Sequence, residues 1–164
     1  MAGPVLSVLI ETPFEPTWRE AIGSRAGDWS DAEGCGVPAS GDGTSEESVR
    51  PFVGSVDTAD DRASVSDAEV AAIRECSGRE WTHAIVVAAM CNQPVDHRTL
   101  AELVASIAEE RDGIVDLGRL DLPDDIGDTV QCTWSEDATD QWTLLAHPAA
   151  VRGWMSRPQF RLLR

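Results

Sequence analysis

Long hydrophobic runs, closely spaced cysteines and lysine are all missing from this 164-residue chain. The longest apolar run, Ala84 to Cys91, is far too short to cross a bilayer, and no basic stretch precedes the first apolar residues as it would in a signal peptide. The four cysteines lie far apart, without the spacing of a zinc site or a redox motif. We therefore predict a cytoplasmic protein with reduced thiols that has no membrane partner.

Several catalytic and cofactor motifs are also absent from the sequence. It contains no glycine-rich phosphate loop, no serine elbow and no dinucleotide fingerprint. A metal site needs three or four converging ligands, whereas His83, His97 and His147 fall in three different predicted elements. The aspartates around residue 125 lack the spacing, the central glycine and the final glutamate of a calcium loop. The sequence predicts neither a metal nor a cofactor.

The charge balance is strongly acidic. Twenty-nine acidic residues face 13 arginines, with no lysine, and the net charge is -16 at pH 7. This charge disfavours binding to nucleic acid or to anionic lipid. Residues 121–140 contain seven acids and no base, whereas residues 141–164 contain four arginines and no acid. Two explanations stay open: the acidity serves the binding of a partner, or it reflects the residue usage of a GC-rich genome.

Length and an apolar content of 42% suit one domain with a sizeable core over residues 1–164. Residues 5–10, 84–91 and 114–117 are apolar on both faces, so we predict that they are strands that share one sheet, with 84–91 in a central position. Shorter or alternating apolar segments predict further strands, which are 130–134, 141–146, an edge strand at 50–56 and a terminal strand at 160–163.

Helices are predicted where apolar residues recur at helical spacing after a start signal. Ser66 and Glu69 form a capping box for a helix over 67–77. Asp96 is the expected N-cap of the clearest helix, which Gly113 closes. The other two helices are expected at 17–26 and from Pro148 onward. The apolar stripe of the clearest helix consists of Leu100, Leu103, Val104, Ile107 and Ala108.

Strands and helices are mixed along the chain without strict alternation, which favours the α+β class. We expect a single mixed sheet with three to four helices packed on it. Residues 27–48 are rich in Gly, Asp, Glu and Ser and have no apolar period, so they are predicted to be a long, polar, flexible loop within the domain.

A spaced series of short motifs runs over roughly the last 75 residues. Its segments are Met90-Cys91-Asn92, Asp96-His97 with the following Leu100 and Leu103, Gly113 to Gly118, Trp154-Met155 and Pro158 to Arg161. This series resembles an uncharacterised family of small actinobacterial proteins, domain of unknown function family 6368. The resemblance implies no activity. Small acidic proteins of this kind often resemble immunity proteins of toxin systems, which is an association and not a physical argument.

The best candidates for chemistry are Cys91, His97 and Asp116, since strand ends and helix starts are where active sites gather. A thiolate near a helix N-terminus, beside an imidazole oriented by a carboxylate, would be an activated nucleophile. The alternative is structural: Asp96 caps the helix, Asn92 holds the loop and Cys91 is a small core residue.

We therefore consider three functions. The first is a protein-binding module, most concretely an immunity-type inhibitor whose acidic surface covers the basic active-site face of a toxin enzyme. The second is a small enzyme or ligand-binding domain that uses the three residues above. The third is a structural or regulatory subunit that homo-oligomerises through its arginine-rich tail. The partner-binding candidates for the first are Asp57, Asp60, Asp61, Asp121, Asp124, Asp125, Asp128, Glu136, Asp137, Asp140 and Trp29, the last as an aromatic anchor.

Overall fold

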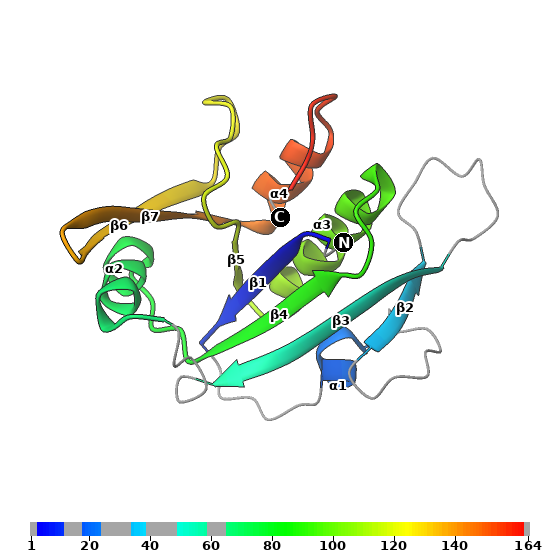
Figure 1. The fold of residues 1–164 in the computed structure, drawn as a ribbon, viewed down its shortest axis with the longest axis horizontal. Helices are drawn as coiled ribbons and strands as arrows, with labels where there is room; N and C mark the ends of the chain where they lie inside the picture. Colours follow the sequence, from blue (N-terminus) through cyan, green and yellow to red (C-terminus); the bar gives the residue numbers. More distant parts are fainter. Residues whose placement is uncertain (1–2, 12–17, 24–33, 39–48, 59–64, 163–164) are drawn as a thin grey trace.

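A computed structural model describes residues 3–11, 18–23, 34–38, 49–58 and 65–162 of the chain. Seven strands and four helices lie within these residues (Figure 1). In chain order they are β1 (Val5–Ile10), α1 (Trp18–Ile22), β2 (Gly34–Pro38), β3 (Val49–Thr58), α2 (Asp67–Ser77), β4 (His83–Ala89), α3 (Pro94–Glu110), β5 (Ile114–Asp116), β6 (Thr129–Glu136), β7 (Thr139–Ala146) and α4 (Pro148–Met155).

The strands form one sheet in the order β2-β3-β4-β1-β5-β7-β6. Every ladder between these strands is antiparallel. β1 lies between β4 and β5, so the prediction that residues 5–10, 84–91 and 114–117 share one sheet is confirmed. The α+β class, with one sheet and four helices packed on it, is confirmed as well. The sheet is antiparallel in all of its described ladders, whereas the prediction was a mixed sheet.

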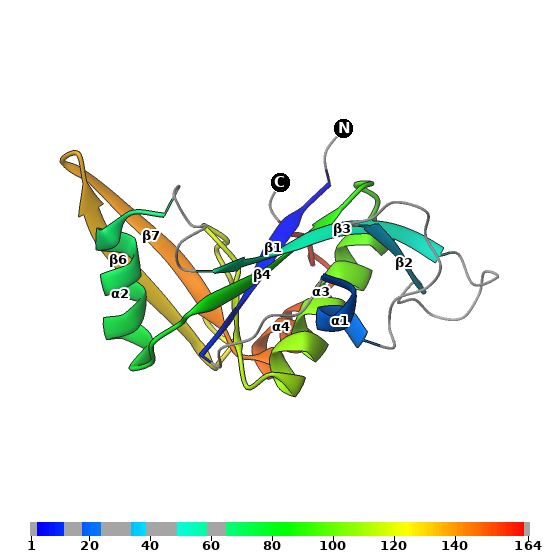
Figure 2. The same cartoon turned by 90° about the horizontal axis from the view of Figure 1, so that it is seen from below.

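Both faces of the central strands are covered, because successive side chains point to opposite faces. On one face, Val8 and Val115 join the large core that α3, α4 and α1 complete. On the other face, Leu9 and Ile114 join a smaller core with Ile73 of α2. Figure 2 shows α2 packed against the β6–β7 end of the sheet, away from α1 and α3. This two-sided burial explains why β1 and β4 read as continuous apolar runs.

Two predictions about the edge of the sheet were wrong. Segment 50–56 is not an edge strand, because β2 pairs with β3 on its outer side. β2 itself lies inside segment 27–48, which was predicted to be a polar loop, and its Cys35 and Val37 are buried in the large core. Two apolar residues among glycines give no alternation long enough to reveal a five-residue strand. The rest of 27–48 lies outside the described residues.

The C-terminal segment also differs from the prediction. Residues 160–162 form no strand, and they follow α4 as an irregular segment. Phe160 packs edge-on against Trp154, with the ring centroids 6.0 Å apart, and Leu162 is buried. The apolar residues that suggested a strand therefore serve to dock an irregular chain onto the core.

Helix α3 is the longest helix and carries the predicted apolar stripe, which is buried. It ends where predicted: the amide of Gly113 donates to the carbonyl oxygen of Ala108 at 2.8 Å. A side chain at Gly113 would meet the backbone oxygen of Leu9 at 2.7 Å, so the chain can pass this close to β1 only with a glycine there. Within the described part of the chain, no helix is long and apolar enough to span a membrane.

The β6–β7 hairpin turns through Asp137 and Ala138, whose φ angles are 48° and 60°. Positive φ at both central residues is the geometry of a two-residue type I′ turn. Aspartate tolerates this region, whereas the Cβ of alanine makes it unfavourable. Ala138 is therefore a strained position in an exposed turn.

We predict that Ala138→Gly raises the free energy of unfolding by about 1 kcal/mol, because glycine adopts positive φ without the steric cost. Urea unfolding monitored by tryptophan fluorescence measures the change. Asp137→Gly is the matched control and should gain less, since aspartate already tolerates the conformation. An Ala138→Gly protein no more stable than the parent would contradict the assignment of the turn.

Candidate functional site

The N-terminus of α3 contains a buried carboxylate that is held from two sides. Asp96, 1% exposed, accepts a hydrogen bond from the backbone amide of Gln93 at 2.7 Å through Oδ2. Its Oδ1 accepts from Nε of Arg50 on β3, also at 2.7 Å. This hydrogen bond to Asp96 raises the pKa of the Arg50 guanidinium above its ordinary value. Asp96 is thus the third residue of the helix. The prediction that Asp96 is the N-cap was wrong, because Gln93 occupies the cap position.

His97 is a second buried polar residue at this helix start, and both of its ring nitrogens are engaged. The backbone amide of Leu162 donates to Nδ1 at 3.0 Å. Because Nδ1 accepts, the ring proton lies on Nε2, which donates to Oδ1 of Asn92 at 2.9 Å. The imidazole therefore joins the C-terminal segment to the loop between β4 and α3.

Arg98 fixes the same C-terminal segment from outside. Its Nη1 donates to the carbonyl oxygen of Met155 at 2.8 Å, and its guanidinium lies 5.6 Å from the centroid of the Phe160 ring. These contacts satisfy a carbonyl oxygen at the last residue of α4 and place a cation over an aromatic face. Three consecutive residues of α3, Asp96 to Arg98, thus anchor β3, the β4–α3 loop and the C-terminal segment.

Asp116, the residue proposed to orient His97, lies on the other side of the sheet. Ile114 of β5 belongs to the core under α2 and Val115 to the core under α3, so Asp116 shares the α2 face. Its Oδ1 accepts from Oγ1 of Thr143 at 2.5 Å and from the amide of Gly118 at 2.8 Å.

The three residues considered for catalysis are therefore not assembled into a triad. His97 packs on the α3 side, Asp116 points to the α2 side, and Cys91 is half-buried at the end of β4 and is not a core residue. A nucleophile and its base must lie within hydrogen-bond reach of each other, and the base must have a free nitrogen. Among the described residues, no group of three or more His, Cys, Asp or Glu is arranged to hold a metal ion.

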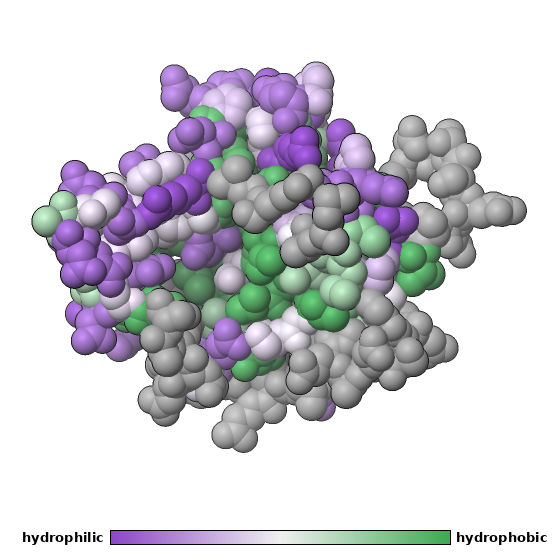
Figure 3. All heavy atoms as spheres, viewed as in Figure 1, coloured by the Kyte–Doolittle hydropathy of each residue, from purple (hydrophilic) through white to green (hydrophobic). Residues whose placement is uncertain are grey.

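The acidic candidates lie mainly on two exposed segments. Asp121, Asp124 and Asp128 are exposed in the loop before β6. The hairpin tip supplies the others, which are Glu136, Asp137 and Asp140 and are all exposed. Figure 3 shows hydrophilic residues gathered over both regions, with apolar residues near the middle of the same face.

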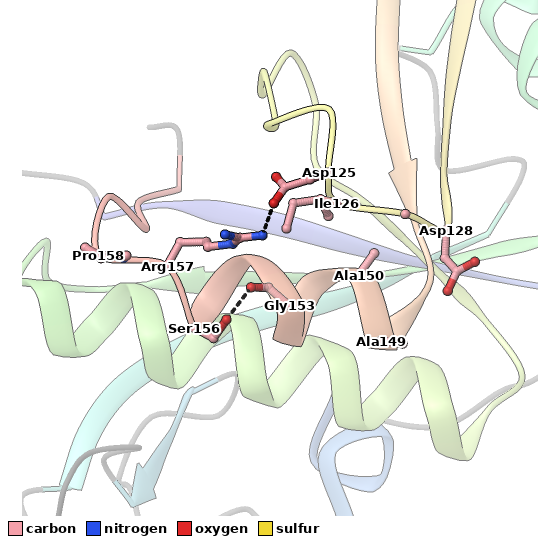
Figure 4. Close-up of a pocket in the computed structure, with 10 residues that line it drawn as sticks. Asp125, Ile126, Asp128, Ala149, Ala150, Gly153, Ser156, Arg157 and Pro158 are labelled. Atoms are coloured by element: carbon pink, nitrogen blue, oxygen red, sulfur yellow. Dashed lines mark hydrogen bonds and ion pairs between the residues drawn. The ribbon is translucent and has the colours of Figure 1, made fainter.

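Asp125 differs from its neighbours because Arg157 pairs with it across a groove (Figure 4). The groove has a volume of about 450 Å³ and lies between the loop before β6 and α4. Its lining consists of Asp125, Ile126, Gly127, Asp128, Ala149, Ala150, Gly153, Ser156, Arg157 and Pro158. Arg157 thus neutralises one carboxylate of the acidic loop.

The second predicted acidic patch is only partly described. Asp57 near the end of β3 is half-buried and accepts a hydrogen bond from Oγ of Ser55 at 2.8 Å. Four strands lie between β3 and β6 in the sheet. At the usual strand spacing, strands β3 and β6 are therefore about 24 Å apart. Asp60, Asp61 and Trp29 lie outside the described residues.

Two of the four arginines of the C-terminal tail are committed to ion pairs inside the chain. Arg152 contacts Glu102 at 3.2 Å and Glu109 at 3.0 Å on α3, and Arg157 contacts Asp125. Arg161 is exposed, and Arg164 lies outside the described residues. The tail is therefore less basic at the surface than its sequence indicates.

Sequence reasoning missed Arg50 as the partner of Asp96. The spacing of two residues in the sequence could have indicated this role. Arg50 is two residues from the buried Phe52 and therefore points to the same face of β3. A charged residue in phase with a buried aromatic residue indicates a buried counter-ion. The identity of that counter-ion, 46 residues away, depends on the packing of α3 under the sheet.

The sequence model of one protein family matches residues 2–164, and its description is a family of unknown function (DUF6368). The match confirms the resemblance found in the last 75 residues and extends it to the N-terminal half. No curated protein and no solved structure shows a significant match.

We predict that His97→Phe lowers the free energy of unfolding by about 1–3 kcal/mol, because the Leu162 amide and the Asn92 side chain both lose a buried hydrogen-bond partner. Urea unfolding measures the loss. His147→Phe is the control, since its side chain is exposed at the start of α4 and should change stability little. Equal effects of the two substitutions would argue against a structural role of His97.

Proposed function

The chain belongs to the DUF6368 family of unknown function, and we propose that it is an acidic, cytoplasmic protein-binding module. Its most concrete form is an immunity-type inhibitor that covers the basic active-site face of a toxin enzyme. The family supplies no activity to transfer. The proposal therefore rests on the charge and exposure of this chain's own residues.

The observation that carries the proposal is the segment 121–140, which has seven carboxylates and no basic residue. The ion pair with Arg157 neutralises one of them, Asp125, and the other six are exposed. Their field therefore extends into solvent. A basic partner would be drawn to this surface, and like charge would keep nucleic acid and anionic lipid away.

The β6–β7 hairpin, which carries Glu136, Asp137 and Asp140, also supports the proposal. The hairpin pairs over its whole length, from Thr129 opposite Ala146 to Glu136 opposite Thr139. Its base continues into the central sheet through β5. Charges on a paired hairpin keep a fixed spacing before the partner arrives, so less conformational entropy is lost when the complex forms.

The two alternatives receive less support. An enzyme that used Cys91, His97 and Asp116 would require these residues to converge, but a sheet separates His97 from Asp116. A subunit that homo-oligomerises through its arginine tail would require free guanidinium groups, but Arg152 and Arg157 already pair within the chain.

The first experiment is affinity capture from the native host with the wild-type protein as bait. The captured protein is then produced separately, and its enzymatic activity is assayed with and without the bait. The proposal requires a basic partner whose activity falls when the bait is added in stoichiometric amount. A captured partner that is acidic, or that remains fully active in the complex, would count against an inhibitor.

We predict that the double substitution Asp124→Asn and Asp128→Asn lowers the association rate with this partner and weakens its dependence on salt. Both side chains are exposed and lack the Arg157 contact, so charge is removed with little change of shape. Long-range attraction between exposed charges is screened over about 10 Å at 0.1 M salt. Stopped-flow association at two salt concentrations measures both effects.

The matched control is Glu75→Gln with Glu80→Gln, which removes the same number of exposed charges from a different part of the surface. If the loop before β6 is the working surface, the control should retain most of the wild-type rate. Equal slowing by the two pairs would indicate that only net charge matters. If neither added salt nor the loop variant slows capture, the acidity has no part in binding.

A further inference from the structure

Two cysteines that are distant in sequence meet where α2 packs against β6. Cys76 lies in the last turn of α2 and is exposed, whereas Cys132 lies in the middle of β6 and is completely buried. Figure 1 shows the helix lying along the β6–β7 hairpin. Fifty-six residues separate the two positions, so no sequence motif marks them as a pair.

Packing and one hydrogen bond bring the two cysteines together. The Cys76 thiol donates to the backbone oxygen of Gln131, the neighbour of Cys132, at a distance of 3.8 Å. Cys132 belongs to the smaller core together with Ile73, which lies one turn before Cys76 on the same face of α2. Cys76 therefore lies against the part of β6 that contains Cys132.

We propose that Cys76 and Cys132 are a redox-active pair that small-molecule disulfides convert to an intramolecular disulfide joining α2 to β6. Cys76 is the residue that the oxidant reaches, and Cys132 is the resolving residue. This inference is independent of the proposed function, since it concerns the chemistry of the two thiols alone.

The reaction takes place in two exchange steps. The Cys76 thiolate attacks one sulfur of the small disulfide, forming a mixed disulfide and releasing one small thiolate. Cys132 then loses its proton to water, and its thiolate attacks Sγ of Cys76 and releases the second small thiolate. The two protein thiols are oxidised by two electrons in total, and the small disulfide is reduced to two thiols.

Burial determines the order and the pace of these steps. Cys132 has no exposed surface, so an oxidant in solution cannot reach it directly. Burial, together with the neighbouring Cys76 side chain, raises the pKa of the Cys132 thiol to about 12. Its thiolate is scarce at neutral pH, so the second step is the slower one and should accelerate about tenfold per pH unit between pH 7 and 9.

The disulfide would close a long loop and fix α2 on the sheet. The closed loop, from residue 76 to residue 132, contains β4, α3 and β5. A cross-link over so long a loop removes many conformations from the unfolded chain, so the oxidised protein should have a higher Tm than the reduced one. In a reducing compartment such a pair stays open and closes only under oxidation.

The test treats the folded protein with oxidised glutathione and follows intact mass over time. Cys91→Ser is the background, because half-buried Cys91 could itself take up glutathione. We expect a transient adduct of one glutathione at Cys76, followed by a product lighter than the starting protein by about two mass units. Peptide mapping should link Cys76 to Cys132, and the Tm of the product should rise.

Two further variants in the same background separate the steps. With Cys132→Ala, the adduct at Cys76 should persist without a second step. With Cys76→Ser, an exposed and therefore tolerant position, Cys132 should remain unmodified. A persistent adduct in the protein that retains both cysteines, a failure of Cys76 to react, or a link from Cys76 to Cys35 would overturn the proposal, even if the Cys132 variant fails to fold.

Discussion

The carboxylate of Asp96 is the group on which the arrangement of this protein depends most. A charged group that is 1% exposed is stable only if it is paired and hydrogen-bonded, and Arg50 and the Gln93 amide meet that requirement. The pair fixes the start of α3 against β3. His97, the next residue, binds the Leu162 amide and so fixes the end of the chain against the same helix. One helical turn thus holds both β3 and the C-terminal segment.

This constraint decides which residues remain available for function. Polar residues at a helix start, close to the end of a strand, suggest an active site, but here they are used in structural bonds. Both nitrogens of His97 are engaged, and Asp116 lies across the sheet with Thr143 and Gly118 as its partners. The exposed carboxylates of the loop before β6 and of the hairpin tip are not needed for packing. These residues are therefore available to bind a protein partner. The thiol chemistry proposed for Cys76 and Cys132 lies at the middle of the same hairpin.

Much of the fold could be predicted because burial leaves periodic marks in a sequence. The continuous apolar run of β4, the stripe of α3 and the Ser66 cap of α2 each indicated the element that forms. β2 escaped prediction because Cys35 and Val37 are the only apolar side chains in a five-residue strand with two glycines and a proline, so the segment shows no clear alternation. For the candidate site, residue types and local position were predictable, whereas partners were not. The contacts of Arg50 with Asp96, of His97 with Leu162 and of Cys76 with Gln131 all join residues more than 40 positions apart, and only tertiary packing brings such residues together.

The most direct test of the structural role of the α3 N-terminus is a comparison of Arg50→Met, Asp96→Asn and the double variant by urea unfolding. Arg50→Met leaves a buried carboxylate without its counter-ion, and we expect it to lower the free energy of unfolding by about 3–5 kcal/mol. Asparagine keeps an oxygen for the Gln93 amide and removes the charge, so adding Asp96→Asn to Arg50→Met should restore part of the lost stability. If Arg50→Met costs less than about 1 kcal/mol, within the range of an exposed ion pair, and Asp96→Asn gives no rescue, the buried pair does not hold the fold together.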